Sequence, residues 1–269
     1  MIAKLKRRQQ RYCTGSRANC HFAFLLLAVN FILLAVFLLD APVSAYVRQS
    51  PSFLKPISNA ITDFGTSGWI LLASSVLFFE ALTSARLARH CKARFEALFI
   101  GHVAAYVFLS IALSGLLANL AKRLIGRARP LFQTDGSVLD LSPLHGSYRF
   151  ESFPSGHATT IGAIMMAVAL MAPRYRVPCL VLALWLGFSR VIIGAHFPSD
   201  VMAGLLFGAW FSVFMASQFA RHGLLFDVPA EGLPRLMRRL PFRRLPRRAG
   251  WRWPGAITLP SPVRLLRIG

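Results

Sequence analysis

The chain has 269 residues, of which 55% are hydrophobic and only 15% charged. Soluble domains usually carry about 25% charged residues, so this composition excludes a typical soluble protein and indicates one of the lipid bilayer. The net charge of +21 could suggest nucleic-acid binding. Most of this charge lies beside the hydrophobic runs, however, where anionic lipid headgroups are the nearer partner, and we expect no nucleic acid.

Apolar runs long enough to cross a bilayer recur along the chain, since an α-helix needs about 20 apolar residues to span the hydrocarbon. Five of them carry at most one acidic, Lys or Arg side chain: 22–39, 69–85, 97–121, 153–173 and 201–220. A sixth, from Val177 to about Ile193, has only thirteen residues before Arg190, which places that arginine near a membrane face. The sequence therefore predicts an all-α fold, an integral-membrane bundle of six transmembrane helices within residues 22–220.

Basic residues set the expected orientation, because cytoplasmic segments carry an excess of Lys and Arg. A basic leader, residues 1–21, precedes the first helix, and an Arg- and Pro-rich tail, residues 221–269, follows the last. With six helices both termini lie in the cytoplasm, and we expect a bacterial inner membrane. The basic connection after Lys122 is then periplasmic, against the usual rule, which suggests that its charges serve a site.

The ends of the chain leave alternatives open. The first apolar run could be a signal peptide cleaved near residues 43–45, although its eighteen residues exceed the usual length of about 7 to 15. Its loss is expected to leave the site intact. The tail holds eleven Arg, which we expect to anchor it among anionic headgroups. The oligomeric state is open, since the Gly-x-x-x-Gly pattern of Gly204 and Gly208 favours packing inside the bundle over dimerisation.

Three short strings place titratable groups at the ends of these hydrophobic helices. They are Lys-Arg-Leu-Ile-Gly-Arg-Ala-Arg-Pro at 122–130, Pro-Ser-Gly-His at 154–157, and Ser189-Arg190 followed by His196 and Asp200. In a six-helix bundle all three fall at the same external face. We therefore expect their side chains to converge on one site there.

Each string also predicts its local structure. Lys122 and Arg129 are seven residues apart, so a helix that continued to Pro130 would carry both on one face. Ser155 is a good N-cap, and Gly156 lets the backbone approach an anion at the N-terminus of the helix that follows.

The third string predicts a helix that begins at Pro198, with Asp200 in its first turn. Four residues after His196, this carboxylate could orient the imidazole. Within the first string, Arg123 and Arg127 are expected to contact headgroups or to set topology.

Two histidines, three cations, one carboxylate and a helix N-terminus suit phosphoryl transfer, in which positioning and charge stabilisation do most of the work. One histidine can attack phosphorus while the other protonates the departing oxygen. The sequence shows no acidic cluster beside them, so we do not expect a two-metal phosphatase site.

Together the strings resemble the signature of the type 2 phosphatidic acid phosphatase family. The resemblance implies that His196 becomes phosphohistidine, that Asp200 orients it, and that His157 acts first as general acid and then as base. It also implies chemistry without a metal or other cofactor. A further implication is a set of phosphate-binding residues: Lys122, Arg129, Ser155, Gly156 and Arg190. The expected activity is that of a membrane lipid phosphatase, a hydrolase that removes a terminal phosphate from a phosphorylated lipid, as monoester or diphosphate, at the periplasmic face.

Two other functions stay open. A phosphotransferase with the same phosphohistidine would pass the group to a lipid or sugar hydroxyl, and no residue separates it from a hydrolase. A non-catalytic lipid-binding protein would need the cations but not the histidines and the carboxylate. The substrate is open too: phosphatidic acid, phosphatidylglycerol phosphate, undecaprenyl diphosphate and lipid A all carry a suitable phosphate. Residues 131–152 are expected to select the headgroup.

Overall fold

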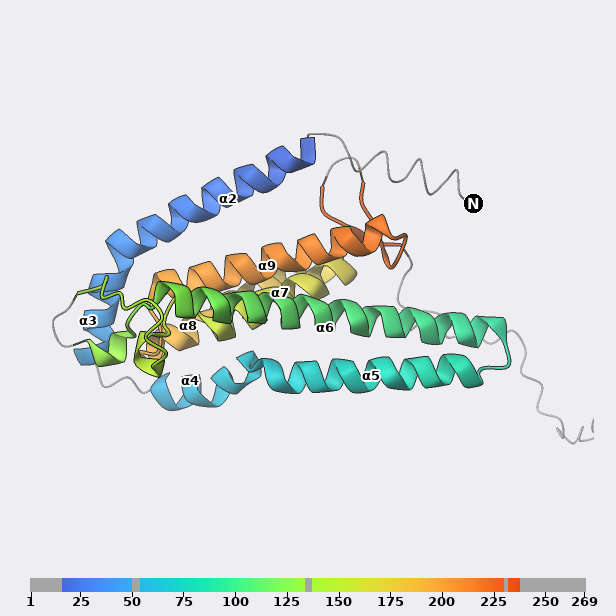
Figure 1. Ribbon diagram of the computed structural model, residues 1–269, viewed down its shortest axis with the longest axis horizontal. Helices are drawn as coiled ribbons and strands as arrows, with labels where there is room; N and C mark the ends of the chain where they lie inside the picture. Colours follow the sequence, from blue (N-terminus) through green and yellow to red (C-terminus); the bar gives the residue numbers. More distant parts are fainter. Residues whose placement is uncertain (1–15, 50–53, 134–136, 230–231, 238–269) are drawn as a thin grey trace, which may run out of the picture. The chain divides into compact units, whose positions relative to one another are not determined.

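The computed structural model describes residues 16–49, 54–133, 137–229 and 232–237, so most of the basic leader and the tail from residue 238 lie outside the described residues. Eight α-helices are described (Figure 1): α2 (Ser16–Ala35), α3 (Ala41–Gln49), α4 (Leu54–Thr62), α5 (Ser67–Leu87), α6 (Cys91–Ile125), α7 (Gly156–Met171), α8 (Arg176–Ile192) and α9 (Pro198–Arg221). Short elements join or follow them: the π-helical η1 (Val36–Asp40), the 3-10 turns η2 (Asp63–Gly65), η3 (Pro130–Phe132), η4 (Tyr148–Phe150) and η5 (Pro173–Tyr175), and an antiparallel pair, β1 (Phe226–Asp227) and β2 (Arg235–Leu236).

Every predicted span is helical, and the prediction of a helical membrane protein is confirmed. Among the described residues, five segments are long and apolar enough to cross a membrane: His21–Gln49, Lys55–Leu87, Cys91–Ile125, Pro173–Ile192 and Pro198–Arg221. The predicted run 153–173 corresponds to α7, which has only sixteen residues, about 24 Å of helix against about 30 Å of hydrocarbon. The number of spans is therefore five by length, with α7 as a shorter apolar helix.

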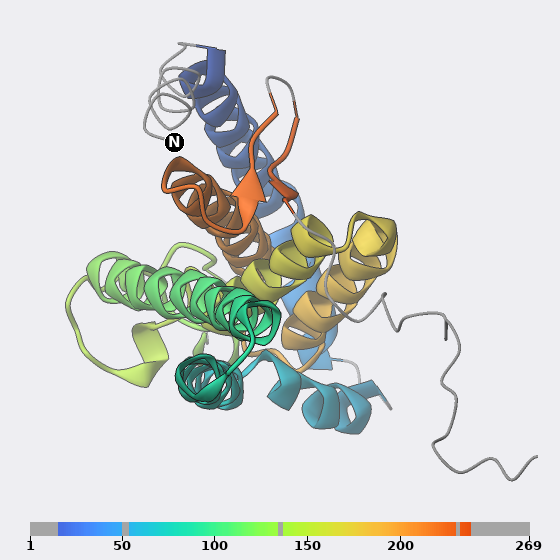
Figure 2. The ribbon, with the colours of Figure 1, turned by 90° about the vertical axis from the view of Figure 1, so that its right-hand side faces the viewer.

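Helix α7 forms the centre of the bundle, packed against α9, α8 and α6 (Figure 2). Its sequence is apolar on all sides, as is typical of a buried helix. Glycines let α9 approach it closely: a methyl group at Gly208 would lie 2.1 Å from the Thr159 carbonyl oxygen, and one at Gly204 would lie 2.5 Å from that of Ser155. The Gly204–Gly208 pattern thus serves packing inside the bundle, as predicted.

The first membrane helix extends beyond its predicted end at residue 39. It continues from α2 through η1 into α3, so that the proposed cleavage segment at 43–45 is helical. The side chain of Asp40, in η1, is fully buried. The helices α3 and α4 were not predicted, and both lie at the end of the bundle where α6 ends and α7 begins (Figure 1).

The predicted continuation of α6 to Pro130 is wrong. The helix ends at Ile125, because Gly126 adopts a left-handed conformation with φ 62° and its N–H bonds to the Lys122 carbonyl oxygen at 2.8 Å. A side chain at Gly126 would collide with the backbone of Ser142, which packs against it. Residues 127–129 therefore leave the helix and run extended beside residues 140–142.

Candidate active site

All three strings meet at one end of the bundle, as the sequence predicts. The C-terminal ends of α6 and α8 carry Lys122 and Arg190, and the N-terminal ends of α7 and α9 carry His157 and Asp200. The second and third strings are joined directly, since the Ser155 N–H donates to the Asp200 carbonyl oxygen at 3.0 Å. Lys122, Arg129, Arg190 and His196 all lie close enough to His157 to interact with it electrostatically.

His196 lies in the loop between α8 and α9, and its ring is buried. Its Nδ1 lies 2.9 Å from the carbonyl oxygen of Ser152. A carbonyl oxygen can only accept, so Nδ1 carries the proton and Nε2 keeps the free electron pair that a nucleophile needs.

Asp200, which the sequence predicts to orient His196, lies beside the ring without a direct hydrogen bond to it. Its Oδ2 lies 3.8 Å from Nδ1, which is a charge contact and too long for a hydrogen bond. The residue between them is Ser152, whose hydroxyl donates to the same Oδ2. The sequence predicts only that residue 152 belongs to the loop that selects the headgroup. Its position two residues before Pro154 is the one signal that could have indicated a place in the site.

Burial lowers the pKa of His196 to about 4, because the charged imidazolium loses its water, while the nearby Asp200 carboxylate opposes the shift. The imidazole is therefore neutral near pH 7. A neutral imidazole with its Nε2 pair free is the form that can attack phosphorus.

Three cations of the site are buried, and each approaches it from a different element. Within the described part of the chain, none has a carboxylate at ion-pair distance. Arg129 donates to the carbonyl and hydroxyl oxygens of Tyr148 at 3.0 and 2.9 Å, and burial lowers its pKa. Arg190 donates from Nη1 to Thr62 at 2.7 Å, and its buried Nε has no partner among the described residues.

Buried cations without counter-ions are costly, so their grouping indicates an anion site. Lys122 supports this assignment: its Nζ lies 3.4 Å from where a side chain of Gly156 would begin. The N-cap prediction for Ser155 is confirmed, because its hydroxyl accepts from the Ala158 N–H at the start of α7. A tetrahedral oxyanion held here would meet three cations and the N-terminus of a helix.

The turn η2 forms one wall of the site, which the sequence did not predict. A methyl group at Gly65 would lie 3.2 Å from Cδ2 of His157, so this turn packs directly against the ring. The Gly-rich composition of the segment was the available signal.

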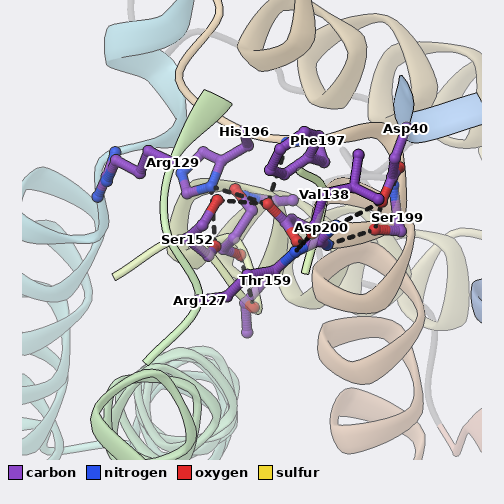
Figure 3. Close-up of polar contacts among 12 residues, drawn as sticks. Asp40, Arg127, Arg129, Val138, Ser152, Thr159, His196, Phe197, Ser199 and Asp200 are labelled. Atoms are coloured by element: carbon purple, nitrogen blue, oxygen red, sulfur yellow. Dashed lines mark hydrogen bonds and ion pairs between the residues drawn. The ribbon is translucent and has the colours of Figure 1, made fainter. Parts of the chain in front are cut away.

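The prediction that Arg127 contacts headgroups or sets topology is wrong. Its guanidinium is buried and lies between two carboxylates, those of Asp40 and Asp200 (Figure 3). Arg123, in the same string, is exposed as expected of a surface residue.

Comparison with known proteins identifies a matching family and several similar proteins. The model of the PAP2 superfamily matches residues 103–223, which include all three strings. A lipid A 1-phosphatase of Rhizobium johnstonii is 44% identical over 232 residues, covering 86% of this chain and 94% of the relative. A lipid A 1-phosphatase of Rhizobium etli is 45% identical over 219 residues, covering 81% and 94%.

Among solved structures, the chain is similar to a transmembrane PAP2-type phosphatidylglycerolphosphate phosphatase from Bacillus subtilis. The TM-score is 0.51 at 23% identity, and the alignment covers 75% of this chain and 94% of that one. At this identity the likeness concerns the fold alone.

Proposed function

Because the chain belongs to the PAP2 superfamily, and is accordingly a membrane lipid phosphatase, we propose that it removes the 1-phosphate of lipid A through a phosphohistidine at His196. The choice of lipid rests on the two rhizobial relatives, which share 44% and 45% of their residues with this chain and are aligned over 94% of their own length. The proposal makes lipid A the phosphorylated lipid partner of the chain.

One observation carries the proposed chemistry: three buried cations, none with a carboxylate at ion-pair distance among the described residues, lie at the end of the bundle that holds both histidines. Phosphoryl transfer needs positive charge around the equatorial oxygens and a nucleophile in line with the leaving oxygen. Lys122, Arg129 and Arg190 supply the charge, with Ser155 and the Gly156 N–H at the start of α7.

In the first step, Nε2 of His196 attacks phosphorus. The N–P bond forms, the bond from phosphorus to the lipid oxygen breaks, and that oxygen takes its proton from His157. The phosphorylated imidazole is positive, since Nδ1 still holds its proton on the Ser152 carbonyl. The nearby Asp200 carboxylate stabilises this charge.

In the second step, His157 acts as base. It removes a proton from water, the water oxygen attacks phosphorus, and the N–P bond breaks with its electron pair returning to Nε2. Inorganic phosphate leaves, and both histidines regain their initial states.

For topology, we propose six membrane crossings, with α7 as a short central one, in the inner membrane of a bacterium. The site then faces the periplasm, and both termini are cytoplasmic. In support, the basic residues Arg86, Arg89, Lys92 and Arg94 flank the α5–α6 connection, at the end of the bundle away from the site (Figure 1). The corresponding domains are the leader 1–21, the phosphatase 22–220 and the tail 221–269.

The proposed function is tested with the purified protein in detergent. Phosphate release is measured from lipid A, phosphatidic acid, phosphatidylglycerol phosphate and undecaprenyl diphosphate. We expect the highest kcat/KM with lipid A, with loss of the phosphate at position 1. We also expect His196→Ala to lower kcat by more than about 10³-fold, as loss of a nucleophile does.

A matched control is His102→Ala. Among the described residues, the His102 ring bonds only the Leu98 carbonyl oxygen of its own helix, and it lies on α6 about 30 Å of helix before Lys122. It should keep wild-type turnover. Equal turnover of His196→Ala and wild type would refute the assignment of His196 as the nucleophile. A preference for another lipid would refute lipid A as the substrate. Transfer of the phosphoryl group to an added lipid alcohol in preference to water would refute hydrolysis as the main reaction.

A further inference from the structure

We propose that Asp40 and Arg127 are positioning residues of the reaction, which hold Asp200 beneath His196 and keep one net negative charge there. The inference rests on the proposed function in one respect, namely that His196 is the nucleophile. It concerns residues outside the set that the sequence singled out as catalytic or phosphate-binding.

Every N–H donor of the Arg127 guanidinium forms a hydrogen bond within the protein. A guanidinium carries five N–H groups. Its Nε and Nη2 donate to the Val138 carbonyl oxygen at 3.0 and 2.8 Å. Its Nη1 donates to the Ser199 hydroxyl at 2.7 Å and to Oδ1 of Asp200 at 2.6 Å, and its Nη2 also donates to Oδ2 of Asp40 at 2.8 Å. No N–H remains to bind a substrate phosphate.

This saturation separates Arg127 from the cations of the anion site. Arg190 keeps an unpartnered buried Nε, and Arg129 has no carboxylate at ion-pair distance in the described chain. Arg127 instead lies over the ring of Phe197, 4.2 Å from its centroid, in the loop that carries His196. The two arginines of the Arg-Ala-Arg sequence therefore have different tasks.

Asp40 closes the other side of the network (Figure 3). Its carboxylate is fully buried and accepts three hydrogen bonds: from Arg127, from the Ser199 hydroxyl and from the Ser199 N–H at 2.9 Å. The contacts join η1, on the first membrane helix, to the first turn of α9. Because Asp200 follows Ser199 directly, the first helix helps to fix the backbone that carries it.

Charge explains why two carboxylates are needed. A single Arg127–Asp200 pair would be neutral, and it would leave nothing to balance the positive phosphorylated imidazole of His196. Asp40 pairs with Nη2 of Arg127 while Asp200 pairs with Nη1, so the charges of the two carboxylates and the guanidinium sum to −1. Buried in low-dielectric surroundings, this net charge acts strongly on the nearby ring.

Geometry adds a second role. Asp200 receives Arg127 on Oδ1, and on Oδ2 it receives the Ser152 hydroxyl and the Phe197 N–H. The Ser152 carbonyl then holds Nδ1 of His196. Displacing Arg127 would therefore move the ring through Ser152, without any direct contact with substrate.

The first test replaces Asp40 by Asn, which keeps the shape and removes the charge. Measured are kcat, KM and the inhibition constants of vanadate and inorganic phosphate. Vanadate mimics the transition state by bonding to the nucleophile, whereas phosphate needs the cations alone. We expect kcat to fall about 10- to 100-fold and the vanadate constant to rise about tenfold, with KM and the phosphate constant within about twofold.

Two variants serve as controls. Asp227→Asn changes an exposed carboxylate in β1, which follows the C-terminal end of α9 and so lies away from the site, and it should leave all four constants unchanged. Asp40→Glu keeps the charge and should restore vanadate inhibition relative to Asp40→Asn. A merely structural role would lower only the amount of active enzyme, and the ratio of the two inhibition constants does not depend on that amount. An unchanged ratio in Asp40→Asn overturns the proposal.

The second test is Arg127→Lys, with the exposed Arg123→Lys as its matched control. We expect a similar fall in kcat with KM and phosphate inhibition unchanged, and wild-type constants for the control. A rise in KM and in the phosphate constant would instead make Arg127 a phosphate ligand. If His196→Ala retains turnover, the proposed function fails. If that variant is inactive and Asp40→Asn keeps the wild-type kcat and ratio, only the positioning role fails.

Discussion

The protonation state of His196 decides whether the first step can begin. Because burial lowers its pKa from the usual 6.5 to about 4, the neutral nucleophile persists as the pH falls toward 4. The same sign applies to folding: the contribution of the neutral ring to stability is complete above pH 6.5 and is lost as the pH falls from 6.5 toward 4.

We therefore predict that the acid limb of kcat/KM contributed by His196 lies near pH 4. The measurement is a pH profile of kcat/KM on lipid substrate, with the ionisation of the substrate phosphate determined separately by ³¹P NMR in the same micelles. A limb near 6.5 that follows the enzyme and not the substrate would show that the ring titrates normally, against the burial argument.

Some residues of the site could be predicted from the sequence, and others could not. Lys122, Arg129, Arg190 and the two histidines could be selected because their spacing within short strings is itself the signal. The task of Arg127 could not, because its partner Asp40 is 87 residues away and looks in the sequence like the polar end of an apolar run. The structure argues against the prediction that loss of the first helix would leave the site intact, because that helix carries Asp40.

At the scale of helices, the contact between α7 and α9 sets the position of the site. Both N-termini carry site residues, and their backbones approach closely only because glycine stands at 162, 204 and 208. A separation of these helices would pull Ser155 away from Asp200, to whose carbonyl oxygen its N–H is bonded.

We predict that Gly208→Ala lowers both stability and activity. Its methyl group would collide with the Thr159 carbonyl oxygen, and such overpacking costs about 1–3 kcal/mol. The control is Gly115→Ala on α6, where no atom of the described residues outside the local helix backbone lies within 4 Å of the added carbon, so stability should be unchanged or slightly higher. Thermal unfolding in detergent and kcat are measured for both. Equal melting temperatures for Gly208→Ala and wild type would contradict the packing argument.

Helix boundaries were predictable where the signal is local. Ser155 is the N-cap of α7 and Pro198 the first residue of α9, as their chemistry requires. The end of α6 was not, because the left-handed turn at Gly126 is fixed by its contact with Ser142, sixteen residues later. The short helices α3 and α4 lack a long apolar run and gave no comparable signal.

For the whole molecule, helix direction alone accounts for much of the site. Alternating spans bring the ends of α6 and α8 and the starts of α7 and α9 to one end of the bundle, and this could be derived by counting hydrophobic runs. The polar link between the first helix and that end could not, since it is made by the buried Asp40 carboxylate, which no apolar pattern marks.

The most direct test of the central claim is to trap the phosphorylated enzyme. Purified protein is mixed with ³²P-labelled lipid A, quenched in alkali to preserve phosphohistidine, and digested for mass spectrometry. We predict phosphate on Nε2 of His196, with no label in His196→Ala. Phosphate on His157 or on a hydroxyl residue, or turnover without any phosphoenzyme, would contradict it.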